Sequence, residues 1–420
     1  MMSSYTNDRR PWPVLALAVT TSVLVVGSVA SARPAHAATV CSAKSYGATG
    51  NGTTKDTAAL QKALTACANG GVAELTAGKY LTGPLTLPSG ITLQIDSGAT
   101  LLASQSASDY PASGGDLTPL LSANKASNVT IDGGGVIDGQ GAPWWAEIEA
   151  EKAAGQSLSP RPAMISLNSV TTATLTNITV KNAPNAHVTM KESTGVTITG
   201  VTISSPSTSP NTDGFDIWSS SNVHLTNSTI DCGDDDVAID SSASDGAAHD
   251  ITISSDTILH GHGLSIGSYT DGGVYNISMH DDTMTGTVAG IRIKSARGRG
   301  GAVHALTYTH ITMTNVTTPI QITAYYPDVP ADGDPAQTVT STTPDYYGIA
   351  ISKVTATGAS AAGQIVGLPE QTITGLTLTS VNIASKTGVT VRNAAVTTSS
   401  VTITASSGSA WIKQSKASVS

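Results

Sequence analysis

The sequence predicts an all-β fold, a single-stranded right-handed parallel β-helix (solenoid) closed by an N-terminal capping α-helix. Three observations predict it. The chain after residue 67 is built from Thr, Ser, Val, Ile, Gly and Asn in short alternating runs, with a single Phe in the whole protein, which suits stacked strands better than an aromatic-filled core. These runs share a repeated template, and one helix-forming segment precedes them.

Residues 1–37 predict a secretory signal peptide. Two arginines precede an apolar run from Val14 to Ala30, and Ala35-His36-Ala37 forms a small-x-small cleavage site. A membrane anchor is the alternative, but the run is short, the cleavage motif follows at once, and nothing later is apolar enough to span a bilayer. We therefore expect a secreted, extracellular protein whose residues 38–420 form a single β-helix domain.

The segment 57–67 predicts the capping helix, the only convincing helix after the signal peptide. Leu60, Leu64 and Cys67 fall at helical spacing, and Asp56 is placed to cap the N-terminus. An open coil end exposes unpaired strand edges and core, so a helix at this place covers them.

Three cysteines remain in what we expect to be an oxidising environment. Cys41 and Cys67 bracket the predicted helix, whereas Cys232 lies far away in the sequence. We expect a Cys41–Cys67 disulfide and a buried free thiol at Cys232; the alternative is that all three are small buried hydrophobic residues.

The repeated template reads apolar-x-apolar-x-x-apolar-x-apolar. It begins at Ala173, Val196, Val223 and Ile251, and more loosely at Ile277, Leu306, Ile349 and Leu376, with intervals of 23, 27, 28, 26, 29, 43 and 27 residues. Repeats of this length with strand periodicity predict coils stacked about 4.8 Å apart. The Asn-x-Thr/Ser triplets at Asn128, Asn177, Asn227, Asn276 and Asn315 are then predicted to be strand or turn positions rather than glycosylation sites.

The charge of the domain excludes a general polyanion binder. Residues 1–37 hold three of the 21 basic and one of the 30 acidic residues, so 38–420 has 18 basic and 29 acidic residues and a net charge of −11. Nucleic acid and membrane are therefore not expected partners. Four of the basic residues nevertheless cluster in "RIKSARGR", from Arg292 to Arg299.

Positions within the repeat place charged residues side by side. Asp234 and His262 each lie 11 residues after their template starts, so we expect them on adjacent coils. Asp213 lies on the preceding coil, and Arg292 and Lys294 on the following one, where alternation in "IRIK" buries both isoleucines and turns both cations outward.

Three consecutive aspartates, Asp234 to Asp236, are costly unless they bind a metal or handle a proton. A solvated turn or a surface calcium site is the alternative for such a triplet in isolation. Beside a histidine and two cations in one groove, however, the cluster suits hydrolysis of an acidic polysaccharide, in which one carboxylic acid protonates the glycosidic oxygen and a second carboxylate activates water.

The segments "NTD" (211–213), "GDD" (233–235), "GHG" (261–263) and "RIK" (292–294), in this order, resemble the four signature segments of the polygalacturonases, glycoside hydrolase family 28. The similarity extends to "YGATGNG" from Tyr46, "GVIDGQGAPWW" from Gly135 and "TPIQITAYYP" from Thr318, and is strongest to the bacterial secreted endo-polygalacturonases.

The resemblance implies a role for each matching residue. Asp234 is the general acid, Asp213 and Asp235 hold and deprotonate water, and His262 tunes the acid or contacts the sugar. Arg292, Lys294, Tyr326 and Asn211 bind substrate. The family acts with inversion and without a metal or other cofactor, and we expect a monomer.

Two positions depart from the family pattern. Asp236 stands where Cys or Asn is usual and is expected to add a charge to the acid cluster. Asp240 stands where bacterial relatives commonly have Lys, and alternation from Val237 predicts that its side chain points outward, where its charge weakens binding of pectate; the alternative is that it bonds to a neighbouring coil.

Four other functions are consistent with parts of the pattern: an exo-acting polygalacturonase, a rhamnogalacturonan or xylogalacturonan hydrolase, a calcium-dependent pectate lyase and a non-catalytic β-solenoid adhesin. The retained "RIK" disfavours the rhamnogalacturonan or xylogalacturonan hydrolase. The combination of "GHG" and "RIK" with the three aspartates disfavours the pectate lyase, and an adhesin has no need to align these charges. No large insertion closes the groove, which favours endo action.

Overall fold

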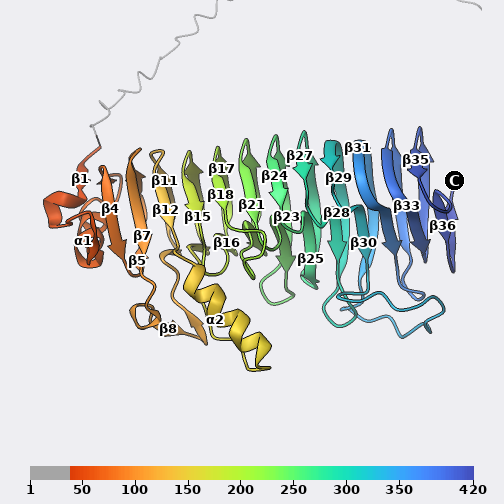
Figure 1. The fold of residues 1–420 in the computed structure, drawn as a ribbon, viewed down its shortest axis with the longest axis horizontal. Helices are drawn as coiled ribbons and strands as arrows, with labels where there is room; N and C mark the ends of the chain where they lie inside the picture. Colours follow the sequence, from red (N-terminus) through yellow and green to blue (C-terminus); the bar gives the residue numbers. More distant parts are fainter. Residues whose placement is uncertain (1–37) are drawn as a thin grey trace, which may run out of the picture. The chain divides into compact units, whose positions relative to one another are not determined.

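The computed structural model describes residues 38–420, so the predicted signal peptide lies outside the described residues. Each coil contributes up to three strands, and the strands of the large sheet pair in parallel with their equivalents on adjacent coils, which confirms the predicted parallel β-helix (Figure 1). The three faces that result are called A, B and C.

Face A carries the first half of the template. Its strands are β1 (Val40–Ser42), β3 (Val72–Leu75), β6 (Thr92–Ile95), β11 (Ser127–Asp132), β14 (Thr171–Thr176), β17 (Thr194–Thr199), β20 (Ser221–Thr226), β23 (Ala248–Ser254), β26 (Val274–His280), β32 (Ile373–Thr379), β34 (Ala394–Ser399) and β37 (Ala417–Val419).

Face B carries the second half. Its strands are β2 (Asn51–Lys55), β4 (Gly78–Thr82), β7 (Ala99–Ala103), β12 (Val136–Asp138), β15 (Thr179–Lys181), β18 (Thr202–Ser204), β21 (Thr229–Cys232), β24 (Thr257–His260), β27 (Thr283–Thr285) and β35 (Thr402–Ala405).

Face C follows a longer turn. Its strands are β5 (Leu85–Thr86), β10 (Leu121–Asn124), β13 (Ile165–Asn168), β16 (Val188–Lys191), β19 (Phe215–Trp218), β22 (Val237–Ser241), β25 (Leu264–Thr270), β28 (Ala289–Lys294), β30 (Thr318–Thr323) and β36 (Trp411–Lys413). Three long strands pass from one face to the next: β29 (Ala302–Thr314), β31 (Asp345–Val366) and β33 (Asn382–Arg392).

The register of face A confirms the predicted repeat at every interval. Each template start pairs with the next, from Ala173 with Val196 to Ile349 with Leu376. The 43-residue interval contains the segment 324–344 between β30 and β31. All five Asn of the Asn-x-Thr/Ser triplets have φ between 52° and 56°, a conformation that Asn tolerates better than most residues, so they serve as the predicted strand and turn positions.

Inward side chains stack into columns that form the core. Beneath face C a column of isoleucines, each at most 1% exposed, runs through successive coils: Ile217, Ile239, Ile266, Ile293 and Ile322. Burying one such side chain contributes about 1.5–3 kcal/mol relative to leaving it exposed. The column fixes the strands whose outward residues carry the charged groups.

Helix α1 (Thr57–Ala66) caps the solenoid as predicted and buries Leu60 and Leu64. The prediction that the side chain of Asp56 caps the N-terminus of this helix is wrong, however. Asp56 occupies the N-cap position but makes no side-chain bond to the helix, because its carboxylate accepts the backbone N–H groups of Thr49 (2.7 Å) and Gly50 (3.0 Å) in the preceding loop. The Cys41–Cys67 disulfide and the buried free thiol of Cys232 are both present.

A second helix, α2 (Ala142–Ala153), corrects the prediction of a single helix. It begins with Pro in its first turn, a favourable place, and buries Trp144 and Ile148 four residues apart, with Trp144 packed edge-on against Tyr110. The signal was present in "APWWAEIEAEKA", whose apolar spacing fits one helical turn.

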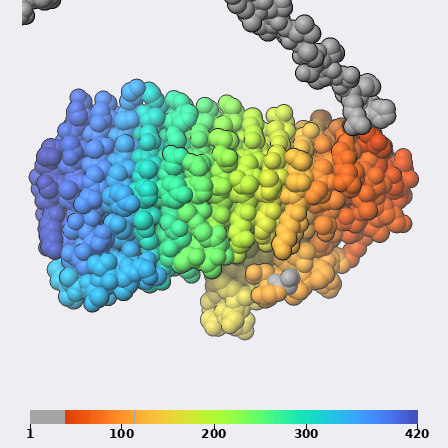
Figure 2. Space-filling model, turned by 180° about the vertical axis from the view of Figure 1, so that it is seen from behind, coloured from red at the N-terminus to blue at the C-terminus, as the bar shows by residue number. Residues whose placement is uncertain are grey.

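Both α2 and the segment 324–344 project on the lower side of the view in Figure 2, where the outline between them is set back. Helix α2 lies between face B and face C of its coil, whereas 324–344 lies between face C and face A. Smaller elements complete the described chain: the 3-10 helices η1 (Ala43–Tyr46) and η2 (Ala107–Asp109) and an antiparallel pair, β8 (Ala112–Ser113) and β9 (Asp116–Leu117). Within 38–420, no helix is long and apolar enough to cross a membrane.

Candidate active site

The turn from β21 to β22 sends its three aspartates in different directions. Gly233 enters the turn where a Cβ would lie 2.1 Å from the carbonyl oxygen of Ser209, so a side chain does not fit. Asp234 is half-buried, while Asp235 and Asp236 are buried. The triplet is therefore not the solvated turn that an isolated run of aspartates suggests.

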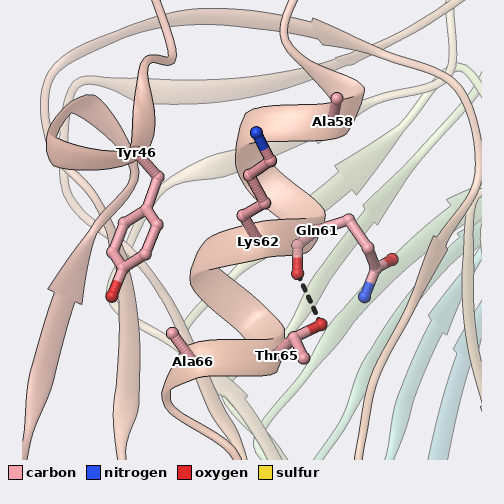
Figure 3. Close-up of a pocket in the computed structure, with 6 residues that line it drawn as sticks. All are labelled: Tyr46, Ala58, Gln61, Lys62, Thr65 and Ala66. Carbon is pink, nitrogen blue, oxygen red and sulfur yellow. Dashed lines mark hydrogen bonds between the residues drawn. The ribbon is translucent and has the colours of Figure 1, made fainter.

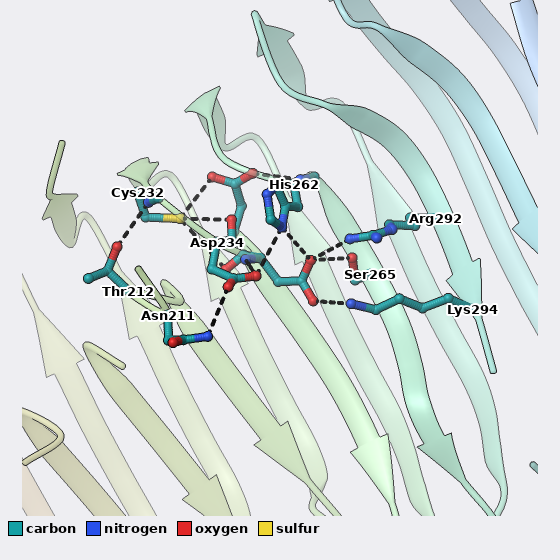
Figure 4. Close-up of polar contacts among 12 residues, drawn as sticks. Asn211, Thr212, Cys232, Asp234, His262, Ser265, Arg292 and Lys294 are labelled. Atoms are coloured by element: carbon teal, nitrogen blue, oxygen red, sulfur yellow. Dashed lines mark hydrogen bonds and ion pairs between the residues drawn. The ribbon is translucent and has the colours of Figure 1, made fainter. Parts of the chain in front are cut away.

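His262 lies beside Asp234 on the next coil, as the repeat predicts (Figure 4). Its backbone N–H donates to the carbonyl of Asp234 (2.8 Å), and its ring Nδ1 lies 2.9 Å from Asp234 Oδ1 and 3.8 Å from Asp235 Oδ1. Both flanking glycines have positive φ, and a Cβ on Gly263 would lie 2.1 Å from the carbonyl of Ala289. The "GHG" motif thus meets a backbone requirement that positions the imidazole.

Asp235 is the centre of the cationic contacts. Arg292 Nη1 donates to Asp235 Oδ1 (2.9 Å) and Lys294 Nζ to Asp235 Oδ2 (2.6 Å), both from β28, as Figure 4 shows. The hydroxyl of Ser265, on the intervening strand β25, also donates to Oδ1 (2.9 Å). Arg292 and Lys294 point outward as predicted, but their charged groups reach Asp235, and sequence reasoning missed Ser265.

Asp213 lies on the turn before β19, and a second acid, Asp216, which sequence reasoning also missed, lies within β19. The charge of Asp216 acts on the carboxyl of Asp213. The buried His187 bonds through Nδ1 to the carbonyl oxygen of Asp213 (2.8 Å) and through Nε2 to the Ser205 hydroxyl (2.9 Å). His187 therefore holds the backbone that carries Asp213, and burial lowers the pKa of its ring to about 4, which keeps it neutral.

Asn211 is placed against Asp234 by an arginine from a distant loop. Arg161 donates to the side-chain oxygen of Asn211 (2.8 Å) and to two backbone carbonyls. This fixes the orientation of the amide, whose nitrogen faces Asp234 Oδ2 at 3.4 Å. No sequence motif includes Arg161, so this contact could not be predicted from the sequence.

The environments of the acids separate their pKa values. Burial, with the charges of Asp216, Asp234 and Asp235, raises the pKa of Asp213 well above its usual range. Burial and the charge of Asp240 raise the pKa of Asp216 to about 7. Burial also acts to raise the pKa of Asp234, but the hydrogen bond and charge of His262 outweigh it and hold that pKa below the ordinary value. Among these acids, the Asp213–Asp216 pair therefore favours the protonated form and Asp234 the ionised form.

Asp236 points away from the site, which corrects the expected extra charge. Its carboxyl accepts the backbone N–H of Gly263 (2.8 Å) and the thiol of Cys232 (3.4 Å). Burial, the larger effect, raises the pKa of Asp236 well above its usual range and so favours its neutral form. A Cβ on Gly261 would lie 2.4 Å from Asp236, so this contact also depends on the glycine.

Asp240 follows the predicted alternation, since Val237 and Ile239 are buried while Asp240 is half-buried. It accepts the backbone N–H of Tyr269 on the neighbouring coil (2.9 Å). This is the bond to a neighbouring coil that the alternative prediction for Asp240 expects. Burial raises its pKa to about 6. Ala238, which pairs in register with Asp216 and Ser265, is buried.

Tyr326 lies over the cationic pair. Its ring centroid is 5.0 Å from Lys294 Nζ and 5.8 Å from Arg292 Cζ. The structure thus brings Tyr326 to Arg292 and Lys294, these two cations to Asp235, and Asn211 and His262 to Asp234.

Asp234, Asp235 and His262 each offer one atom within 4.8 Å of the others, the spacing of a metal site. Their existing contacts do not suit one, because the oxygens of Asp235 already accept bonds from two cations and a hydroxyl. Calcium prefers several free oxygen ligands. The arrangement suits proton transfer better.

A hollow of about 530 Å³ on the capping helix is unrelated to this chemistry (Figure 3). It is lined by Tyr46, Ala58, Gln61, Lys62, Thr65 and Ala66. The lining holds no carboxylate or histidine to pair with its lysine, so it provides no acid and base.

Comparisons with known proteins show the family of this chain. The model of glycosyl hydrolases family 28 matches residues 67–405. An endo-polygalacturonase of Pectobacterium carotovorum subsp. carotovorum is 38% identical over 291 residues, which cover 64% of this chain and 72% of that protein. A polygalacturonase of Ralstonia nicotianae is 34% identical over 331 residues, 64% of this chain and 62% of that protein.

Among solved structures, the polygalacturonase from Erwinia carotovora ssp. carotovora aligns with a TM-score of 0.71 and 30% identity, over 91% of this chain and 98% of that one. The family model spans most of the chain, including every residue of the charged cluster. The protein belongs to glycosyl hydrolases family 28.

Proposed function

We propose that this protein is a secreted endo-polygalacturonase that hydrolyses α-1,4-galacturonosyl linkages of polygalacturonate and pectin with inversion. The observation that carries the proposal is the meeting of Asp234, Asp235 and His262 with the outward cations of β28 on one face. Acids and cations together match the two needs of this reaction, which are proton transfer and recognition of an acidic polymer.

In this mechanism Asp234 donates a proton to the glycosidic oxygen, while Asp213 and Asp235 orient and deprotonate water. The pKa of Asp234 is low in the free protein, so binding must raise it. Substrate carboxylates add negative charge beside Asp234 and attract Arg292 and Lys294 away from Asp235. Both changes raise the pKa of Asp234, so that it can take a proton from the Asp213–Asp216 pair, whose pKa values are raised.

Endo action is supported by the shape of the surface. The outline of the molecule between α2 and 324–344 is set back along several coils in Figure 2. The relatives from Pectobacterium carry the name endo-polygalacturonase. A polymer can lie across such a surface with both ends free.

Purified protein incubated with polygalacturonate tests the proposal in three ways. We expect new reducing ends without ultraviolet-absorbing unsaturated uronides, activity that persists in chelator, and NMR signals of inverted configuration at the first-formed reducing end. Long early products indicate endo action. Unsaturated products would indicate a lyase, retained configuration would refute the mechanism, and no release of reducing ends would leave a binding protein.

A further inference from the structure

The basic cluster from Arg292 to Arg299 contains one cation that the proposed mechanism does not use. Arg292 and Lys294 pair with Asp235, and Arg297 pairs with Glu370 (2.6 Å) and Asp334 (3.5 Å). Arg299 has no ion pair in the part of the chain that the structure describes. Its one side-chain hydrogen bond is a long contact, 3.4 Å, to the backbone carbonyl of Tyr326.

The guanidinium of Arg299 is held between two tyrosine rings. Its Cζ lies 5.2 Å from the ring centroid of Tyr269 and 5.1 Å from that of Tyr326. Stacking of this kind contacts the planar faces of a guanidinium and leaves the N–H groups at its edge able to donate. Those N–H groups have the geometry that binds a carboxylate through two parallel bonds.

The backbone beneath Arg299 is also fixed. Its carbonyl accepts the N–H of Thr270 (2.9 Å), and the N–H groups of Gly298 and Gly300 both donate to the carbonyl of Thr342 (3.0 and 3.1 Å). A cation held in this way loses little conformational entropy when it binds an anion.

Arg299 adjoins the candidate active site through a shared neighbour. The ring of Tyr326 contacts Arg292, Lys294 and Arg299 together. On the far side of Arg299, Tyr269 is 46% exposed, and its ring lies 5.6 Å from that of Trp218 on β19. A row of side chains thus extends from the catalytic cluster toward earlier coils, in the order Tyr326, Arg299, Tyr269 and Trp218. The aromatic rings of this row can pack against sugar rings.

We propose that Arg299 and Tyr269 form a further substrate-binding subsite, in which Arg299 binds the free carboxylate of a uronate residue that packs on Tyr269. This uronate is distinct from the one beside Arg292 and Lys294. The inference rests on the proposed function, and it makes the enzyme selective for substrate that is de-esterified at two positions.

The test compares Arg299→Ala, Arg299→Lys and wild type on fully de-esterified polygalacturonate and on highly methyl-esterified pectin. Loss of a charge-assisted contact predicts a fall of about ten- to a hundredfold in kcat/KM on the de-esterified polymer, mainly through KM, and a much smaller fall on the esterified one. Arg299→Lys should recover only part of the loss, because Lys lacks the planar fork. Lys62→Ala, on the exposed side of α1, removes one positive charge far from the groove and controls for net charge.

Equal losses on both polymers, or a loss accompanied by a matching drop in Tm, would show that Arg299 only holds Tyr326 and would overturn the subsite. A second measurement does not depend on turnover: the affinity of galacturonate oligomers of increasing length by calorimetry. For wild type, the affinity should rise sharply when the oligomer becomes long enough to place a galacturonate on Arg299. Arg299→Ala should abolish this rise, and a rise that persists in the variant would also overturn the proposal. If wild type bound and cleaved neither polymer, the proposed function itself would fail.

Discussion

Lys294 Nζ lies 2.6 Å from Asp235 Oδ2, although 59 residues separate them in the sequence. Lys294 is only 6% exposed, so this ion pair is shielded from solvent and stronger than a surface pair. Arg292 shares the same carboxylate, but its side chain is more exposed, 12% against 7% for that of Lys294. The two cations of β28 therefore differ in how free they are to bind substrate.

That difference predicts different defects. Arg292→Ala should reduce kcat/KM by roughly ten- to a hundredfold on de-esterified substrate and less on highly methylated pectin, because the lost partner is a carboxylate. Lys294→Met should lower kcat on both substrates, because Asp235 loses a buried counter-ion. Steady-state kinetics on the two polymers check this, and the same pattern for both variants would contradict the division of roles.

Asp234→Asn should lower kcat by about 10²–10⁴-fold, the usual contribution of a positioned proton donor, with Tm close to that of wild type. Asp231→Asn is the matched control, because Asp231 contacts the Nδ1 of His260 at 2.8 Å as Asp234 contacts that of His262 at 2.9 Å, but on the outer surface. The control should keep wild-type kcat. Unfolding of Asp234→Asn without a specific loss of turnover would assign the cluster a structural role.

Asp240 should restrain binding of the polyanion in a way that depends on salt and pH. Asp240→Lys is expected to lower KM for pectate at low ionic strength, with the gain fading as salt screens the charge. Because burial raises the pKa of Asp240 to about 6, the penalty in wild type should be present above pH 6 and fade below it. The neighbouring charges Lys294, Asp235 and Arg299 act on the same group.

The control for Asp240 is Asp240→Asn, which keeps an oxygen to accept the Tyr269 N–H while removing the charge. We expect a smaller salt-dependent gain from it. A KM that is unchanged in both variants, or a gain that ignores salt, would leave the contact to Tyr269 as the whole role of Asp240.

Two buried aspartates should make the fold more stable in acid. Asp256 accepts the N–H of Ser228 (2.6 Å) and Asp282 that of Asp256 (2.9 Å), and burial raises their pKa values to about 7 and about 8. A raised carboxyl pKa means that the folded state holds protons that the unfolded state has released. The stability they contribute is therefore complete below pH 4 and lost as the pH rises toward 8.

Asp256→Asn and Asp282→Asn retain the accepting oxygens but cannot ionise. At pH 8 each should raise the free energy of unfolding by roughly 1 kcal/mol or more, and the difference from wild type should shrink toward pH 4. Thermal unfolding across this range checks the prediction, and an equal effect at both ends would contradict it.

The sequence by itself determined the solenoid, its register and the order of the charged residues on its coils. Strand alternation and a strand-length repeat suffice for this, because each coil stacks its apolar positions on those of the last, as Val223 pairs with Ile251 and Ile251 with Ile277. Asp234 and His262 could therefore be placed side by side from their equal distances to the template.

Only the tertiary structure decided what the turns between faces B and C do with their side chains. These turns have no period, and packing against other coils sets their direction, so Asp236 turns inward to Cys232 and Gly263 while Asp235 meets Lys294. Contacts from distant loops, such as Arg161 to Asn211, likewise depend on how the chain returns in space. Alternation along a strand fixes the face on which a side chain lies, but the partner it meets depends on neighbouring coils.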